Sequence, residues 1–329
     1  MRRLAAPLTL AVLLPLALAA CGDDDEPADN GDTGGGTHTV VHAQGETEVP
    51  DDPQRIAVLW RPSLSALVDL GFEPVAAAAE TADGADLATF LPDDFPAGDL
   101  EIVGSTNEPD IEALAAADPD LIVSVDIAAL AEAYDSLSQI APTVSLAWEG
   151  TGSWRTHVEE LAEALGVPER ADEIVAEYDA HVQEVRDAVG DPGAVEVSLA
   201  RVQASDVLRL ETPASFPGQV LDDVGFARPA GQLEPDPDRD FIEISLELIP
   251  EADGDVVFVL ANGENTGTRE TITSSALWQN LPAAQAGAVV DADYDVWGSS
   301  TYRGAHAILD DLEAALGGSG GAATPSGGG

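Results

Sequence analysis

Short apolar runs alternate with amphipathic stretches along the chain from about residue 53 onward. The first run covers residues 55–59 and predicts a buried strand. Residues 62–70 then predict a helix, because Pro62 suits a helix start and Gly71 a helix end. The same pattern predicts further strands at 74–78, 121–125 and 143–146, and helices at 110–117 and 127–140. Such alternation is typical of a parallel sheet covered by helices.

A helical stretch without strands separates the two halves of the chain. Its first helix has an apolar face formed by Trp154, Val158, Leu161 and Leu165, and Gly166 and Pro168 end it. A second helix is expected over residues 169–189, about 30 Å long at 1.5 Å per residue. This helix predicts a stiff strut between two lobes.

The second half of the chain repeats phrases of the first half. Residues 66–72 match 220–226, and the pair 111–114 and 120–123 matches 246–249 and 255–258 in the same order. The simplest cause is a shared architecture, although chance similarity between common α/β phrases remains an alternative. The predicted fold class is therefore α/β, with two similar lobes, each a mostly parallel sheet covered by helices, joined by one long rigid helix.

The amino terminus has the pattern of an export signal. Arg2 and Arg3 precede an apolar stretch over residues 8–20, which is too short to span a bilayer as a stable helix. The sequence Leu-Ala-Ala-Cys-Gly at 18–22 resembles a bacterial lipobox, so Cys21 is the predicted lipidation site. An ordinary signal peptide with a chance cysteine is the alternative. The predicted organisation has six parts: 1–20 signal peptide, 21–36 tether, 37–150 first lobe, 151–193 helical segment, 194–316 second lobe and 317–329 tail.

The charge of the chain excludes several function classes. The formal net charge is -48, and all 13 basic residues are arginine. Such a surface offers no basic footprint for nucleic acid and no electrostatic attraction to anionic lipid. Acidity of this kind also serves solubility or tolerance of a salty habitat. The single cysteine excludes an intramolecular disulfide and a cysteine-cluster metal site.

Several phrases resemble one known family, the iron-siderophore-binding lipoproteins of bacterial ABC importers, whose relatives carry cobalamin or haem. The phrases lie at 49–56, 103–109, 118–122, 140–144, 244–247, 278–283 and 297–298. The resemblance covers residues 37 to 316. It implies two α/β lobes joined by one long helix, with a ferric siderophore held between them and delivered to an ABC-type permease. It further implies an extracytoplasmic monomer, anchored to the cell membrane, with no cofactor, no directly bound metal and no catalytic residue.

Candidate ligand-binding residues follow the predicted strands, because ligands of open α/β sheets sit beyond the carboxyl ends of the strands. They are Trp60, Arg61, Trp148, Arg201 (directly after a strand expected at 195–200), Trp297 and Tyr302, with weaker candidates Phe216, Arg239 and Arg303. Arginine offers a planar fork of donors to the oxygens of a ferric chelate, and aromatic rings cover its apolar body. For each residue alone, a surface arginine or a core aromatic is the alternative.

Glu112 and Glu247 occupy equivalent places in the two repeats. In the family, one glutamate per lobe docks against arginines of the permease, and two symmetric carboxylates suit a two-fold partner. The alternative is a pair of acids that stabilise helix N-termini.

Two other functions remain open at this point. A cobalamin or haem carrier would keep the import role, with Tyr302 as a possible axial ligand. A lipid-anchored hydrolase is the alternative from another class, although the body of the chain before the Gly/Ser tail has no Gly-x-Ser-x-Gly elbow and no glycine-rich phosphate loop. The five histidines form no close cluster beyond His38 and His42, which disfavours a carrier of bare zinc or manganese.

Overall fold

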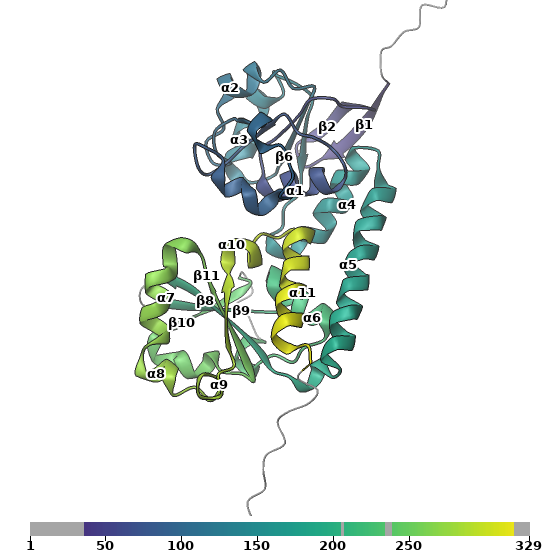
Figure 1. Ribbon diagram of the computed structural model, residues 1–329. Helices are drawn as coiled ribbons and strands as arrows, with labels where there is room; N and C mark the ends of the chain where they lie inside the picture. Colours follow the sequence, from purple (N-terminus) through teal and green to yellow (C-terminus); the bar gives the residue numbers. More distant parts are fainter. Residues whose placement is uncertain (1–35, 205–206, 234–238, 319–329) are drawn as a thin grey trace, which may run out of the picture. The chain divides into compact units, whose positions relative to one another are not determined.

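The computed structural model describes residues 36–204, 207–233 and 239–318, which carry two five-stranded sheets and a two-stranded hairpin (Figure 1). Cys21, the predicted signal segment, and nearly all of the predicted tether and tail lie outside the described residues. No helix in the described ranges combines the length and the apolar character that a membrane crossing requires.

The first sheet is entirely parallel, with strand order β5-β4-β3-β6-β7. Its strands are β3 (Ile56–Val58), β4 (Ala76–Ala77), β5 (Glu101–Ile102), β6 (Leu121–Val125) and β7 (Thr143–Leu146). Every residue of β3, β4, β6 and β7 is buried, as expected for parallel strands covered on both faces. The connecting helices are α1 (Arg61–Asp69), α2 (Ile111–Ala116) and α3 (Ala128–Leu137), with 3₁₀ turns η1 (Ala85–Phe90) and η2 (Ala97–Asp99).

A hairpin precedes this sheet. Strands β1 (Thr37–His42) and β2 (Gly45–Pro50) pair antiparallel. The backbone N–H of Ala43 donates to the carbonyl of Ser145 in β7 at 3.0 Å, which ties the turn to the sheet. The hairpin, labelled β1 and β2 in Figure 1, therefore forms a separate two-stranded ribbon that contacts β7.

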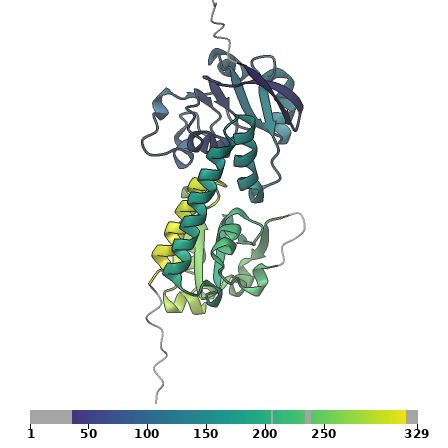
Figure 2. The same ribbon diagram turned by 90° about the vertical axis from the view of Figure 1, so that its right-hand side faces the viewer.

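Two helices follow β7 and the short turn η3 (Thr151–Ser153): α4 (Trp154–Ala164) and α5 (Pro168–Val189). Pro168 opens α5, and Gly190, with φ of 88°, ends it. Tyr178, Val182, Val185 and Val189 are buried along one face, as the sequence pattern predicts. That face packs against α6 (Phe216–Val224) and α11 (Tyr302–Leu316), and both views show α5 running beside α11 (Figures 1 and 2).

The second sheet is mixed, with strand order β10-β9-β8-β11-β12. Its strands are β8 (Val197–Ala204), β9 (Val207–Glu211), β10 (Phe241–Ser245), β11 (Val256–Ala261) and β12 (Val289–Asp293). β8, β11 and β12 are parallel, whereas β9 runs antiparallel to both β8 and β10. The expectation of two helix-covered α/β lobes and a long helix is confirmed, but the pair β9 and β10 is an addition that the repeat does not predict.

The remaining elements cover this second sheet. They are η4 (Pro192–Ala194), η5 (Ala230–Gln232), η6 (Leu246–Ala252), η7 (Gly263–Asn265), α7 (Thr266–Thr273), α8 (Ala276–Gln279), α9 (Pro282–Ala286) and α10 (Tyr294–Trp297). Leu199, Phe258 and Phe216 belong to a core shared with α5 and α11, whereas Leu210, Val257 and Trp278 form a second core on the other face. Gly218 lets α6 approach the end of β9, because a Cβ there would lie 1.8 Å from the carbonyl oxygen of Thr212.

Candidate functional site

Trp60 and Trp148 lie together at the carboxyl ends of β3 and β7. Their ring centroids are 5.5 Å apart in an edge-to-face arrangement, and both rings are half-buried. Trp148 also meets the ring of His157 on α4 edge to face, at 5.3 Å. Among the residues that the structure describes, the indole N–H of Trp60 has no hydrogen-bond partner. The structure thus brings together two of the predicted ligand-binding aromatics.

His157 supports this aromatic pair from the core. It is buried, and burial lowers its pKa to about 4, so the ring is neutral near pH 7. Its Nε2 lies 2.8 Å from Oγ of the buried Ser63, and its Nδ1 has no hydrogen-bond partner within the described part of the chain. A serine–histidine pair without an orienting acid and without access to solvent has no means to act on a substrate. The hydrolase alternative therefore gains nothing from this contact.

Three guanidinium groups surround the ring of Phe241, and Arg201, Arg209, Arg239 and Phe241 are called the arginine cluster below. The guanidinium carbons lie 5.4, 4.0 and 5.5 Å from the Phe241 centroid, in the order Arg201, Arg209, Arg239. The sheet register explains the gathering, because Arg201 lies opposite Arg209 between β8 and β9. Side chains directly opposite one another share one face of the sheet.

Arg201 lies inside β8 and not after a strand end, so the predicted position directly after a strand at 195–200 is wrong. The strand continues for three residues because β8 pairs with the antiparallel β9. Arg201 is 8% exposed and its guanidinium is 4.4 Å from the ring centroid of Tyr294, to whose hydroxyl it donates a hydrogen bond. It is therefore the buried member of the arginine cluster.

A pocket of about 500 Å³ adjoins the arginine cluster and is called the arginine-side pocket. It is lined by Trp148, Glu149, Gly150, Thr151, Gly152, Ala214, Arg239, Asp240 and Phe241. The hydroxyl of Thr151 donates to the carboxylate of Asp240, which links the turn η3 to the segment before β10. The pocket thus joins an aromatic from the first sheet's loops with the cationic and aromatic groups of the second sheet.

The other predicted residues lie apart from this pocket. Trp297 is 0% exposed, 4.9 Å from the ring of Phe258, and donates to Asp311 at 2.8 Å. Tyr302 is 3% exposed and packs on Trp154 at 4.7 Å. Both belong to the core, because the chain after β12 turns their side chains inward. In this conformation neither ring presents surface to a ligand, and Tyr302 offers no open axial position to a haem.

The weaker candidates and Arg61 make contacts within the protein. Arg61 pairs with Asp86 at 3.2 Å and lies over the ring of Phe90. Arg303 donates to Asp69 at 2.5 Å and so joins α11 to α1. Phe216 is fully buried against Trp154. Of the three weaker candidates, only Arg239 lines the arginine-side pocket.

Glu112 and Glu247 are both exposed in the first turn of their helices. Asp110 caps α2 by accepting from the backbone N–H of Glu112 at 3.0 Å. Glu247 lies in the 3₁₀ turn η6, so the two repeats differ here in helix type.

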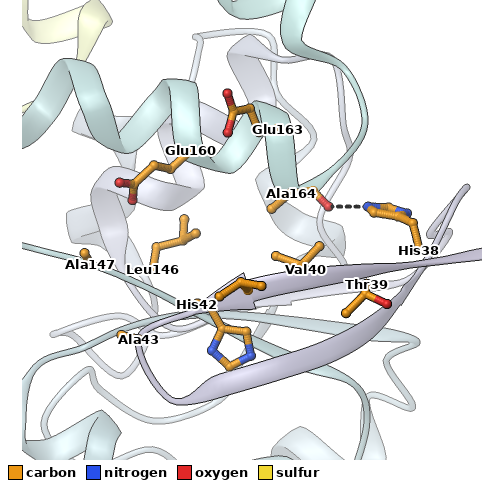
Figure 3. Close-up of a pocket in the computed structure, with 11 residues that line it drawn as sticks. His38, Thr39, Val40, His42, Ala43, Leu146, Ala147, Glu160, Glu163 and Ala164 are labelled. Carbon is orange, nitrogen blue, oxygen red and sulfur yellow. Dashed lines mark hydrogen bonds between the residues drawn. The ribbon is translucent and has the colours of Figure 1, made fainter.

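A second pocket, of about 560 Å³, lies between β1 and α4 and is called the histidine-side pocket (Figure 3). Its lining includes Val40, His42, Glu160 and Glu163. Burial raises the pKa of Glu160, and neighbouring Glu163 adds to this effect. His38 closes one end by donating from Nε2 to the carbonyl of Ala164 at 3.1 Å. No arginine lines this pocket to offset its two carboxylates, whereas Arg239 lies beside Glu149 and Asp240 in the arginine-side pocket, so the histidine-side pocket suits an anionic ferric chelate less well.

The residues that sequence reasoning missed are Arg209, Glu211 and Phe241. A weak signal exists, because residues 208–211 and 242–245 alternate apolar and polar residues, although each strand begins with two successive apolar residues. Recognition of these two strands would place Arg209 and Glu211 on one face.

Known proteins resemble this chain over most of its length. A sequence profile of the family described as periplasmic binding protein matches residues 56–296. The chain is 32% identical to the "Probable siderophore-binding lipoprotein YfiY" of Bacillus subtilis, over 91% of this chain and 93% of that protein. It is 28% identical to the Fe(3+)-citrate-binding protein YfmC of the same species, over 92% of each. The crystal structure of Staphylococcus aureus SirA complexed with staphyloferrin B superimposes with a TM-score of 0.71 at 28% identity, covering 85% of this chain and 98% of SirA.

Proposed function

Because the chain belongs to the periplasmic binding protein family, we propose that it captures a ferric siderophore at the arginine-side pocket and delivers it to an ABC-type permease. The names of YfiY and YfmC and the ligand of SirA support this class of cargo. The proposal assigns a binding role and no catalytic residue to the chain.

The observation that carries the proposal is the arginine cluster beside a pocket with an aromatic wall. The chain has 13 basic residues and a net charge of -48, yet three arginines meet at one phenylalanine ring. This local cluster of cations in a strongly acidic protein suits the binding of an anionic or oxygen-rich ligand. Trp148 offers an apolar face for the body of the chelate.

The test is a tryptophan-fluorescence titration of the purified chain with ferric siderophores of the hydroxamate, catecholate and carboxylate classes, haem, cobalamin and free ferric ion. We expect saturable quenching by at least one siderophore class, because Trp148 lines the pocket. A response to haem or cobalamin alone would keep the import role and reject the ferric cargo. Silence throughout the panel would reject the proposal.

The contact set we propose is Trp60, Arg61, Trp148, Arg201, Arg239 and Phe241. Arg201 and Arg61 have their own acidic partners, Glu211 and Asp86, so their role toward the ligand is electrostatic as much as direct. Trp297 and Tyr302 are left out because their rings are buried.

We further propose that Glu112 and Glu247 dock on the permease, as two exposed acids at equivalent places in the two repeats. The check is ligand uptake by cells that depend on this protein. The double variant E112A/E247A is expected to abolish uptake while purified protein keeps its affinity for the ligand. Unchanged uptake would refute the docking role.

Lipidation at Cys21, with residues 1–20 as signal peptide and 21–36 as tether, is part of the same proposal. The support is the lipobox pattern, together with the word lipoprotein in the name of YfiY. The protein would then act as a monomer outside the cytoplasm, on the cell membrane. The substitution C21A is expected to release it from the membrane fraction, and retention there would contradict the anchor.

A further inference from the structure

Glu211 is a buried carboxyl directly behind the arginine cluster. It is 2% exposed and ends β9, opposite Phe241 in the register with β10. Its Oε1 lies 3.0 Å from Nε of Arg201. The edge of the Arg201 guanidinium beyond this contact meets Tyr294. Glu211 thus forms an ion pair with Arg201 at Nε, while Tyr294 accepts a hydrogen bond from Nη1 of the same guanidinium.

The charged and titratable groups around Glu211 come from five segments. They are Arg201 on β8, Arg209 on β9 itself, Arg228 before η5, Asp240 before β10, and Ser215 at the cap of α6. Arg228 donates to the backbone carbonyl of Glu211, so it stabilises the strand end and leaves the carboxyl to Arg201. Arg209 has its own partner, Glu243, at 3.5 Å.

These pairings decide how much charge reaches the arginine-side pocket. When Glu211 is ionised, it offsets the charge of Arg201, as Glu243 offsets Arg209, and Arg239 carries the cationic character at the pocket wall. When Glu211 is neutral, the charge of Arg201 is free to act on an anion. Because the pair is buried, its field is weakly screened by salt.

We propose that Glu211 is a positioning residue that holds Arg201 and sets the positive charge available to an anionic ferric ligand, so that affinity rises when Glu211 takes up a proton. This inference rests on the proposed function and adds a pH dependence to the same site. Linkage requires the reciprocal effect, in which the bound anion favours the protonated carboxyl.

The direction of the effect follows from the environment. Burial raises the pKa of Glu211 to about 7, with Asp240 acting in the same sense and Arg201 and Arg228 acting against it. Ligand affinity is therefore expected to be higher at about pH 6 than at about pH 8. A bound anion that raises the pKa of Glu211 by one unit binds the protonated form tenfold more tightly than the ionised form, so we expect about a fivefold range in affinity between pH 6 and pH 8.

The experiment compares the wild-type chain with E211Q and E211D, using ferric citrate and ferric staphyloferrin B as probes at pH 6.0, 7.0 and 8.0. All three proteins meet the same ligand, so the ratio of their dissociation constants removes the titration of the probe itself. E211Q is expected to bind at pH 8 as tightly as the wild type does at pH 6, and to lose the pH dependence specific to the protein. E211D keeps a carboxyl and is expected to retain a pH dependence.

Parallel pH profiles for the wild type and E211Q would overturn the inference while leaving the proposed function intact. Binding of no ferric siderophore at any pH would reject both. If E211Q fails to fold, calorimetry of the wild type at pH 7.5 in two buffers of different ionisation enthalpy decides the matter. Proton uptake on binding, corrected for the free probe, is expected, and zero uptake would overturn the inference.

Discussion

The arginine-side and histidine-side pockets are nearly equal in volume, about 500 and 560 Å³, yet they differ in chemistry. The arginine-side pocket has Arg239, Phe241 and Trp148 on its walls. The histidine-side pocket has Glu160 and Glu163 on α4, and Figure 3 shows the ring of His42 pointing away from both. Two acids line each pocket, and the arginine-side pocket differs by adding the cation Arg239 and the rings of Phe241 and Trp148. The comparison teaches that volume alone does not select a binding site, and that an available cation and an aromatic surface do.

The difference also has a structural origin. The arginine-side pocket lies where the loop after β7 meets the segment after β9 and the start of β10. The histidine-side pocket lies beside the hairpin, with one wall from β1 and the other from α4. Both pockets touch the carboxyl end of the parallel strand β7, where ligands of open α/β sheets bind, so the opposite wall distinguishes them: β10 in the first and β1 in the second.

A charge reversal in the arginine-side pocket is expected to have the largest effect. If it had none, the distinction between the two pockets would be lost. R239E places an acid on the wall of the arginine-side pocket and is expected to weaken ferric siderophore binding by about 30- to 100-fold, since like charges oppose the anion. The matched control is E163R in the histidine-side pocket, expected to change the dissociation constant by less than about twofold. Both are measured by fluorescence titration. A large effect of E163R with none from R239E would place the ligand in the histidine-side pocket and refute the proposed site.

Removal of an aromatic side chain from the pocket wall tests the same distinction between the pockets and is expected to have a smaller effect on affinity. W148L is expected to reduce affinity about 5- to 20-fold and to remove most of the quenching signal, because the lost ring covers the apolar part of the ligand. V41A is the control, since Val41 lines the histidine-side pocket and is 76% exposed. It should leave affinity unchanged. Isothermal calorimetry gives the affinity independently of fluorescence, and equal losses in the two variants would indicate a general change in the protein.

The sequence predicts the strands and helices of the molecule better than the residues that line its pocket. The strands at 121–125 and 143–146 have the predicted bounds, because each is a short run of apolar and small hydroxyl residues that is buried throughout. The long helix was expected at 169–189 and spans Pro168–Val189, since Pro168 and Gly190 punctuate it strongly. Apolar runs and helix ends are local signals, and a single sequence carries them fully.

The pocket residues depend on contacts that the sequence does not display. Trp297 and Trp60 both lie near the end of a strand, yet Trp297 is buried on Phe258 while Trp60 meets Trp148. Which way a ring turns after a strand is decided by the helices packed on that sheet. Arg201 gains its place only through pairing of β8 with β9. Phe241, the centre of the arginine cluster, was missed because a half-buried antiparallel strand gives a weak signal.

The smallest expected effect concerns stability and again separates the two pockets. Burial, with Glu163 as a like-charged neighbour, raises the pKa of Glu160 in the histidine-side pocket. A carboxyl whose pKa is raised by folding binds more protons in the folded state, so its destabilising effect grows as pH rises above its unfolded pKa. E160Q should therefore raise Tm slightly at pH 7, by about 1 °C, and leave it unchanged near pH 4.

Glu159, one residue earlier and exposed to solvent on α4, provides the matched control. E159Q removes the same charge from the same helix without relieving burial, so it should give a smaller rise in Tm at pH 7. Differential scanning calorimetry at the two pH values distinguishes the variants. Equal changes in Tm would mean that the overall acidity of the protein, and not burial in the histidine-side pocket, causes the destabilisation by Glu160. A rise in Tm confined to E160Q would show that burial in the histidine-side pocket destabilises the ionised Glu160, in contrast to the arginine-side pocket, where acids and arginines offset one another.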